Sequence, residues 1–261
     1  VVPGKQPQAV IRQQALPPVG NTRRGSLIVT ELAHAVGLGD YFSFGLEELN
    51  SARLAPLGVT LEEIKQKGVV PVGDPWQEGM PDELATPSKK IEFFSRRFQE
   101  AGFEPLPLWQ PPSTQPSADD PQSFRLIHGH QAIHTHSTTA DCAYLMGITH
   151  RYHLERIWLN AGRAQAPAVE EGDWVVVENE HGKGIVQVHV TEGIHPDCVW
   201  LASGYGGFSA GMHVARGVGI SPNDFMPVDY EPISAHAMMA EVIVQVRKAT
   251  LAEASTAQLA A

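Results

Sequence analysis

The chain has 261 residues, 43% of them hydrophobic, and a formal net charge of -10 at pH 7. A chain of this size supports one ordinary hydrophobic core and a smaller piece, so we expect one main domain and a minor one. The acidic balance, with Lys and Arg scattered along the chain, excludes a nucleic-acid-binding protein. Two cysteines are too few for a disulfide framework, and no apolar stretch reaches transmembrane length.

Residues 1–21 contain several prolines and show no helical period. We interpret this segment as an extended lead that lies on another part of a larger protein, with a disordered tail as the alternative. The chain opens with Val1 rather than with Met, so we expect the natural polypeptide to be longer.

Two helices are predicted next. Apolar residues recur at helical spacing over residues 26–36, and Gly37 follows as a stop signal. Over residues 60–67, Thr60 precedes Glu63 in the capping-box pattern, which is typical of the start of a helix.

The pattern then becomes extended. Residues 90–94 predict a short strand, followed by a turn or short helix, and a proline-rich linker over residues 110–122 marks the clearest domain boundary. Beyond it, short β-branched or alternating runs separated by turn signals predict six strands, over residues 124–127, 156–159, 174–178, 184–190, 198–202 and 241–246. Closing six strands on themselves removes exposed sheet edges, so we expect a small β-barrel.

The connection over residues 128–142 carries four histidines within nine positions, followed by hydroxyl side chains. His134 and His136, at a spacing of two, would share one face of a strand and ligate a metal ion. Alternatively, Gly129 lets the backbone approach a ligand, while imidazoles and hydroxyls donate hydrogen bonds to phosphate or heterocycle oxygens. A polar loop whose histidines bind local carbonyl groups is the third interpretation. The pattern alone leaves all three open.

Two further connections carry candidate binding residues. Residues 203–211 read SGYGGFSAG, whose glycines permit positive φ and close approach to a ligand, although a flexible turn is the commoner meaning of such a stretch. Residues 217–239 form a proline-restricted loop in which Asn223 and Asp224 offer amide and carboxylate edges to a heterocycle. Asn and Asp are equally common as turn formers after Pro, so a structural role stays open.

Several segments, in this order, resemble the C-terminal region of the dimethyl sulfoxide reductase superfamily of molybdenum and tungsten enzymes. TPSKKIEFFS is similar to the strand that leads into the family's last domain, and HGHQAIHTHSTT is similar to its cofactor loop. RIWLNAGRAQAPAVEEGDWVVVENEHGKGIVQVHVTEGIHPDCVWL resembles its strand, helix and GD-led hairpin, and PNDFMPVDYEPISAHAMM its closing Asn-acidic loop. Within the superfamily, segments such as GLGDYFSF and HAMMAEV most resemble the polysulfide, thiosulfate, tetrathionate and arsenate reductase branch. Pro167 departs from the family pattern and should shorten the helix after Asn160.

The resemblance implies a mainly β fold with some α structure, namely a six-stranded double-psi-type β-barrel preceded by a small α/β segment. Residues 1–109 would be the C-terminal end of the preceding α/β domains, 110–122 the linker, 123–249 the molybdopterin dinucleotide-binding barrel and 250–261 a tail that forms a frayed helix. Residue matching implies no catalytic residue and no metal ligand in this chain. It implies a cofactor-binding set of His130, His134, Thr135, His136, Ser137, Thr138, Asn160, Ser203, Gly204, Tyr205, Asn223, Asp224 and His236.

The resemblance also implies a function. The barrel would close over two molybdopterin guanine dinucleotides that carry molybdenum or tungsten, in an oxidoreductase acting on a sulfur or arsenic oxyanion. The family's iron–sulfur cysteines and metal-ligand segment have no counterpart in this sequence, so we expect the isolated chain to be inactive.

Expected partners are the remainder of the large subunit, an iron–sulfur electron-transfer subunit and a membrane anchor, in a periplasmic, membrane-associated complex with a cytoplasmic location as the alternative. Two other interpretations stay open. One is a non-catalytic cofactor-binding or interaction barrel, and the other is a metal-dependent barrel enzyme using His128, His130, His134 and His136.

Overall fold

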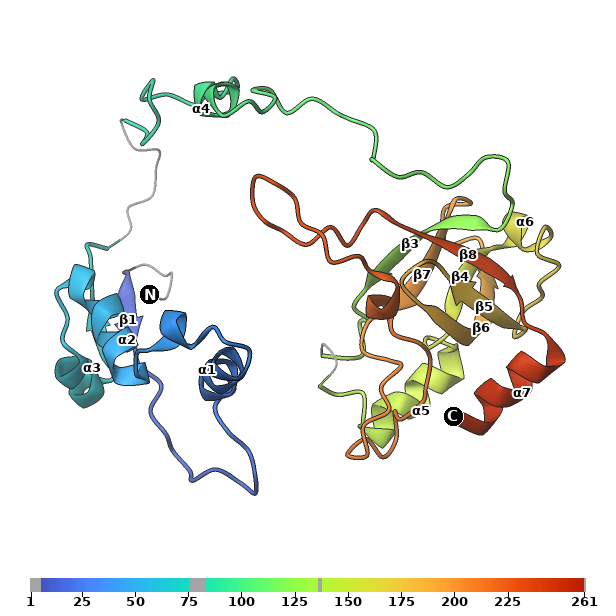
Figure 1. Cartoon of the computed structure of the whole chain (residues 1–261), viewed down its shortest axis with the longest axis horizontal. Coiled ribbons are helices and arrows are strands. Elements are labelled where there is room, and N and C mark those ends of the chain that lie inside the picture. The colour runs from blue at the N-terminus through green and yellow to red at the C-terminus, as the bar shows by residue number, and fades with distance from the viewer. Residues whose placement is uncertain (1–5, 76–82, 136–137, 261) are drawn as a thin grey trace. The chain divides into compact units, whose positions relative to one another are not determined.

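The computed structural model describes residues 6–75, 83–135 and 138–260. The chain divides into two compact units, Val1–Pro107 and Leu108–Ala261 (Figure 1). Among the described residues, no helix combines the length and apolar character of a membrane span.

The first unit combines a two-stranded sheet with short helices. Strand β1 (Gln8–Val10) pairs antiparallel with β2 (Val69–Pro71). Between them lie the helices α1 (Gly25–Ala35), η1 (Gly39–Phe42), α2 (Leu46–Leu54), η2 (Ala55–Leu57) and α3 (Leu61–Lys67). The core of this unit is small and consists of Ala9, Val59, Leu61, Ile64 and Val70.

Both predicted helices of this unit are confirmed, as α1 and α3. The capping prediction is confirmed as well, because the Thr60 Oγ1 accepts a hydrogen bond from the Glu63 backbone N–H at 3.1 Å. The prediction of a strand over residues 90–94 is wrong. These residues are irregular and are followed by the short helix α4 (Arg96–Glu100). Ile91 and Phe93 are exposed there, and an extended run without a ladder partner has no sheet hydrogen bonds to hold it.

The second unit is built on a closed barrel of six strands, as predicted. Its strands are β3 (Ser123–Gly129), β4 (Ile157–Asn160), β5 (Trp174–Glu178), β6 (Lys183–Thr191), β7 (Cys198–Ala202) and β8 (Val242–Lys248). The order around the barrel is β3-β7-β4-β6-β5-β8. The pairs β3/β7 and β4/β6 are parallel, and the other four are antiparallel. The predicted six-stranded double-psi-type barrel is confirmed by this closed, mixed sheet.

The barrel core follows from the two-residue period of its strands. Phe124 and Leu126 of β3 are fully buried, whereas Arg125 between them is not. The same alternation places Ile157 and Leu159 of β4 inside. The remaining buried core is supplied mainly by aliphatic residues of the other strands, including Val175, Val177, Val186, Val188, Val199, Leu201, Val242, Val244 and Val246.

Helices and long connections complete the second unit (Figure 1). Helix α5 (Ala143–Tyr152) precedes β4, and α6 (Ala161–Ala164) follows it and ends before Pro167, as predicted. The short helix η3 (Pro222–Phe225) lies in the long connection to β8. The tail forms α7 (Leu251–Ala260), which is joined to the barrel by ion pairs of Glu253 with Arg247 and Lys183.

Candidate functional site

The predicted histidine and glycine connections leave the barrel side by side. Strands β3 and β7 are parallel neighbours, and their last residues, Gly129 and Ala202, are register partners. The Ser203 backbone N–H donates to the Gly129 carbonyl at 2.8 Å, and the His128 Nδ1 lies 3.4 Å from the Ser203 Oγ. We call residues 130–142 the histidine loop and residues 203–211 the glycine turn. The barrel therefore places both segments at one end, the carboxyl ends of β3 and β7.

The glycine turn is fixed against the segment that leads into η3. Gly206 has a φ of +79°, and a Cβ at this position would lie 2.3 Å from the Ser221 backbone N. The Gly206 N–H donates to the Val218 carbonyl, and the Gly217 N–H donates to the Gly207 carbonyl, each at 2.9 Å. Glycine at position 206 is thus required by close approach of the chain to itself. The third predicted segment consequently lies against the glycine turn.

Helix η3 is anchored on the turn between β5 and β6. The Asn179 Nδ2 donates to the Phe225 carbonyl at 2.8 Å, and a Cβ on Gly182 would lie 2.2 Å from the Asp224 carbonyl oxygen. The side chains of Asn223 and Asp224 remain exposed. Their amide and carboxylate groups can therefore contact a ligand at this end of the barrel.

Two predicted residues, His134 and Tyr205, meet in the buried layer between the histidine loop and the glycine turn. They are 9% and 6% exposed, and their rings are in edge-to-face contact with centroids 6.0 Å apart. The hydroxyl of Thr149, on α5, lies 2.8 Å from the His134 Nε2 and 3.2 Å from the Tyr205 hydroxyl. The Tyr205 hydroxyl donates to the Gln131 Oε1 at 2.8 Å. Thr149 and Gln131 were not in the predicted set, because a Thr on a helix and a lone Gln carry no motif.

Burial shifts the acid–base behaviour of two groups at this end. It raises the pKa of Tyr205 above its ordinary value, so the phenol stays protonated and can donate at neutral pH. Burial also lowers the pKa of His128, with a smaller contribution from the neighbouring His130. Both side chains therefore favour their neutral forms.

Asp141 joins the end of the histidine loop to the chain just after the glycine turn. Its Oδ1 accepts hydrogen bonds from the backbone N–H groups of His213, Val214 and Ala215, at 2.8, 2.6 and 3.1 Å. These three N–H groups hold the pKa of Asp141 below its ordinary range. Sequence reasoning missed this carboxylate, although it lies two residues after the hydroxyl run that ends at Thr139.

Asn160 lies at the other end of the barrel. Strands β4 and β7 are antiparallel, with Trp158 opposite Trp200, so the end of β4 lies beside the beginning of β7. The Asn160 Oδ1 accepts from the Gly162 N–H, capping α6, and its Nδ2 donates to the Ile194 carbonyl, both at 2.9 Å. Both polar atoms of Asn160 are thus used inside the chain.

The remaining predicted residues are distributed as follows. His130, Thr135 and Thr138 are exposed on the histidine loop, and Gly204 has a positive φ of 102° in the glycine turn. His136 and Ser137 lie outside the described residues. His236 lies in the connection between η3 and β8, residues 226–241, part of which projects from the barrel in Figure 1. Its side chain and that of His128 line the same pocket of about 550 Å³.

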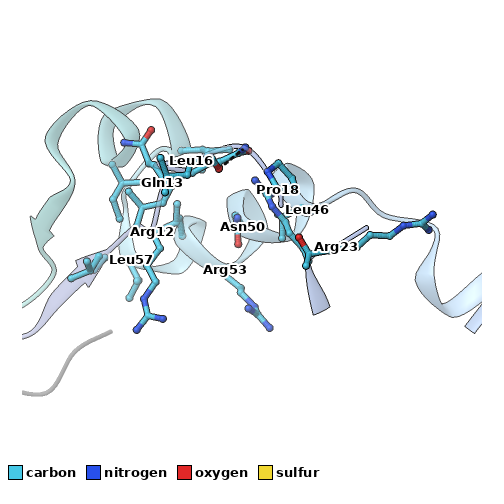
Figure 2. A pocket seen from close by; sticks show the side chains of 18 residues that line it. Arg12, Gln13, Leu16, Pro18, Arg23, Leu46, Asn50, Arg53 and Leu57 are labelled. Atoms are coloured by element: carbon cyan, nitrogen blue, oxygen red, sulfur yellow. Dashed lines mark hydrogen bonds between the residues drawn. The ribbon is translucent and has the colours of Figure 1, made fainter. Parts of the chain in front are cut away.

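The other two large pockets differ in their relation to this site. One of about 650 Å³ is lined by Gly206, Gly219 and Asp224 and so adjoins the glycine turn and η3. Another, of about 760 Å³, belongs entirely to the first unit and is lined by none of the predicted site residues. Figure 2 shows Arg12 and Arg53 projecting to the same side of it.

The metal-ligand interpretation of the histidines finds no support in the described ranges. Within residues 6–75, 83–135 and 138–260, no group of three or more His, Cys, Asp or Glu side chains is arranged to hold a metal ion. Of the four histidines proposed for such a site, His134 uses both ring nitrogens in contacts with Thr149 and Thr139.

Comparison with known proteins shows what this barrel is similar to. Residues 124–243 match the family described as "Molydopterin dinucleotide binding domain". The barrel is thus similar to this family, and the chain as a whole is similar to part of the large subunits of the dimethyl sulfoxide reductase superfamily, as its sequence predicted.

Individual relatives show how far this similarity extends. The chain is 26% identical over 260 residues to the thiosulfate reductase molybdopterin-containing subunit PhsA of Salmonella typhimurium, covering 88% of this chain and 33% of the relative. It is 22% identical to the dimethyl sulfoxide reductase DmsA of Escherichia coli, covering 77% of this chain and 28% of the relative. The structure of acetylene hydratase from Pelobacter acetylenicus superimposes with a TM-score of 0.56 at 21% identity, over 93% of this chain and 35% of that one, which shows a shared fold. The chain thus spans about a third or less of the length of these relatives.

Proposed function

We propose that the barrel binds a molybdopterin guanine dinucleotide at the carboxyl ends of β3 and β7, as the C-terminal part of a molybdenum oxidoreductase large subunit. The observation that carries this proposal is the register pair Gly129 and Ala202, which brings the histidine loop and the glycine turn to one end of a barrel of the matching family. The packing of Gly206 on Ser221 adds the segment of Asn223 and Asp224 to the same end.

The donor set fits such a cofactor. The exposed side chains of His130, Thr135 and Thr138 suit the oxygens of a diphosphate and a pterin, because imidazole and hydroxyl groups donate hydrogen bonds to both. The exposed Asn223 and Asp224 suit the hydrogen-bonding edge of a guanine or pterin, since a carboxylate accepts two parallel N–H bonds. The chemistry of these side chains therefore supports binding and orientation of the cofactor.

Within this proposal, Ser203, Gly204, Tyr205 and His236 belong to the same end of the barrel, and His136 and Ser137 are included from their place in the sequence. We leave Asn160 out of the contact set, because both of its polar atoms are used at the opposite end. The bound cofactor would supply the metal centre for oxygen-atom or electron transfer. The barrel's own side chains bind it, orient it and hold the two loops around it.

The proposed oxidoreductase acts on a sulfur or arsenic oxyanion. The similarity to the thiosulfate reductase subunit supports this substrate class, and the chain covers 33% of that relative. A second copy of the cofactor, an iron–sulfur cluster in the remainder of the large subunit, an electron-transfer subunit and a membrane anchor complete the proposed assembly.

The cofactor proposal is tested by anaerobic titration of the 261-residue chain with molybdopterin guanine dinucleotide released from a purified molybdoenzyme. Native mass spectrometry should show one added cofactor, and pterin fluorescence should give its affinity. Asp224→Ala should weaken binding about tenfold, since it removes a charge-assisted hydrogen bond. Glu192→Ala is the matched control, because it removes an exposed carboxylate just beyond β6, at the other end of the barrel. Absence of the pterin adduct, or equal weakening in both variants, would contradict the proposal.

A further inference from the structure

Six hydrogen bonds form one continuous chain through the buried layer between the histidine loop, α5 and the glycine turn. Four of them run from His134 to Thr149, from Thr149 to Tyr205, from Tyr205 to Gln131 and from Gln131 to the Leu154 carbonyl. The other two join the opposite side of the His134 ring to the Thr139 hydroxyl, and that hydroxyl to the Thr135 backbone N–H, at 3.2 and 2.9 Å. The chain ends on a backbone N–H at one side and a backbone carbonyl at the other.

The direction of this chain is fixed from its carbonyl end. The Leu154 carbonyl can only accept, so the Gln131 side chain must present its Nε2 there. Its Oε1 then faces Tyr205 and can only accept from the phenol. Tyr205 has a single hydroxyl proton, which is used in that bond, so its oxygen accepts the proton of Thr149.

The same reasoning continues to His134. Because the Thr149 hydroxyl proton is given to Tyr205, its oxygen must accept from the His134 Nε2. On the other side of the ring, the Thr139 oxygen already accepts the Thr135 backbone N–H. In the neutral ring, whose one proton is on Nε2, Nδ1 can only accept, so the Thr139 proton is directed to it. Every polar atom along the chain is satisfied in this arrangement, as buried polar atoms require.

We infer that His134 is held as the neutral tautomer protonated at Nε2, and that His134, Thr149 and Gln131 are positioning residues that fix the histidine loop to the glycine turn. This role rests on the proposed function of the two loops. It differs from the cofactor contact expected of His134, because neither ring nitrogen is left to reach a ligand. The residues of the histidine loop that meet the cofactor are then the exposed ones around it.

The tautomer is tested by long-range 1H–15N NMR of the cofactor-free chain, with the His134 signals assigned by their loss in His134→Gln. A pyrrole-type Nε2 and a pyridine-type Nδ1 are expected at neutral pH. The opposite tautomer, or an average of the two, overturns the assignment. Tyr205→Phe removes the acceptor of the Thr149 proton, so it should shift the His134 signals toward such an average.

The positioning role is tested by affinity for molybdopterin guanine dinucleotide. Thr149→Val removes the shared hydroxyl at nearly constant volume and should weaken binding about tenfold, because the links of a buried network depend on one another. Thr149→Ser keeps the hydroxyl and should restore both the affinity and the NMR signature. The matched control is Thr191→Val at the end of β6, at the other end of the barrel, where the hydroxyl accepts the Gly193 backbone N–H, and it should change neither.

The outcomes separate this inference from the proposed function. If the unaltered chain binds no cofactor, the proposed function fails while the NMR result still decides the tautomer. If the chain binds cofactor and Thr149→Val binds it equally well, the positioning role is wrong. If Thr149→Val does not fold, Gln131→Glu serves in its place, because at neutral pH its carboxylate cannot donate to the Leu154 carbonyl. This variant should shift the His134 NMR signals toward an average of the two tautomers and weaken cofactor binding about tenfold.

Discussion

Asn160 and Asn223 have the same side chain in two different surroundings in this barrel. Asn160 is 6% exposed, caps α6 with its Oδ1 and bonds the Ile194 carbonyl with its Nδ2. Asn223 is exposed on η3, at the end where the histidine loop and the glycine turn meet. A buried amide with both atoms used stabilises the fold, whereas an exposed amide at the candidate site can contact a ligand.

Asn160→Ala should therefore lower the free energy of unfolding by about 1–2 kcal/mol, since it removes an N-cap and leaves the Ile194 carbonyl without its donor. Cofactor affinity should not change. Guanidinium unfolding and pterin titration measure the two effects. Asn223→Ala is the control and should show the reverse pattern, with near-unchanged stability and weaker binding. A comparable loss of affinity in Asn160→Ala would place this residue in the cofactor site.

The pH dependence of the Asp141 contact can be predicted from the direction of its pKa shift. The three backbone N–H groups lower its pKa in the folded chain, so the contact stabilises the fold above the unfolded pKa of about 4 and is lost as the pH falls through the lower folded value. The protection of residues 207–216 against hydrogen exchange, relative to the intrinsic rate at each pH, should accordingly fall as the Asp141 carboxylate becomes protonated. Asp141→Asn should show low protection already at neutral pH, with no further loss from this contact on acidification. Unchanged exchange in this variant would show that the carboxylate does not hold the loop.

At the scale of elements, the sequence predicted what local patterns can specify. The six strands follow from alternation and turn signals, because a two-residue period on a half-buried surface is a strong local signal. α3 follows from the Thr60 and Glu63 capping pattern. Helix α2 was missed because its apolar residues do not form a clear stripe, and its sequence LEELNSARL leaves no residue buried.

Other elements depend on tertiary contacts that no local pattern reveals. β1 and β2 have three residues each and are defined by pairing with one another across most of the first unit. The sequence correctly predicted positive φ in the glycine turn, but it does not reveal which part of the chain packs against that turn. In the structure Ser221 occupies that place beside Gly206, and the Thr149 hydroxyl lies between two predicted site residues.

Gly206→Ala should disturb the site through this close approach. The added Cβ would lie 2.3 Å from the Ser221 backbone N, at a φ of +79° that an alanine rarely adopts. We expect a loss of about 1–3 kcal/mol of stability and weaker cofactor binding, because strain at such a position must be relieved by moving the segment before η3. Thermal unfolding and pterin titration measure both. Gly211→Ala, whose Cβ would have only an ordinary 3.7 Å contact with the Ser209 Oγ, should leave both unchanged.

At the scale of the whole molecule, the barrel explains how segments far apart in the sequence form one site. Parallel pairing of β3 with β7 carries the histidine loop and the glycine turn out of the same end, and closure leaves no strand edge unpaired. The fully buried core of the barrel, including Phe124 and Phe225, gives these connections a rigid base. Side chains of the long connections can therefore serve either the fold or ligand binding, without any change in the strands.

Because the proposed site belongs to the second unit alone, cofactor binding should stabilise that unit selectively. A ligand at 100 times its dissociation constant adds about 2.7 kcal/mol to the free energy of unfolding of the state that binds it. The near-ultraviolet circular dichroism of Trp158 and Trp200, whose rings lie 4.8 Å apart on β4 and β7, reports unfolding of the barrel. The denaturant concentration at the midpoint of this circular-dichroism transition should rise when cofactor is bound. Hydrogen exchange of β1 and β2 in the first unit should not slow. Equal protection of both units would show that the cofactor also engages the first unit.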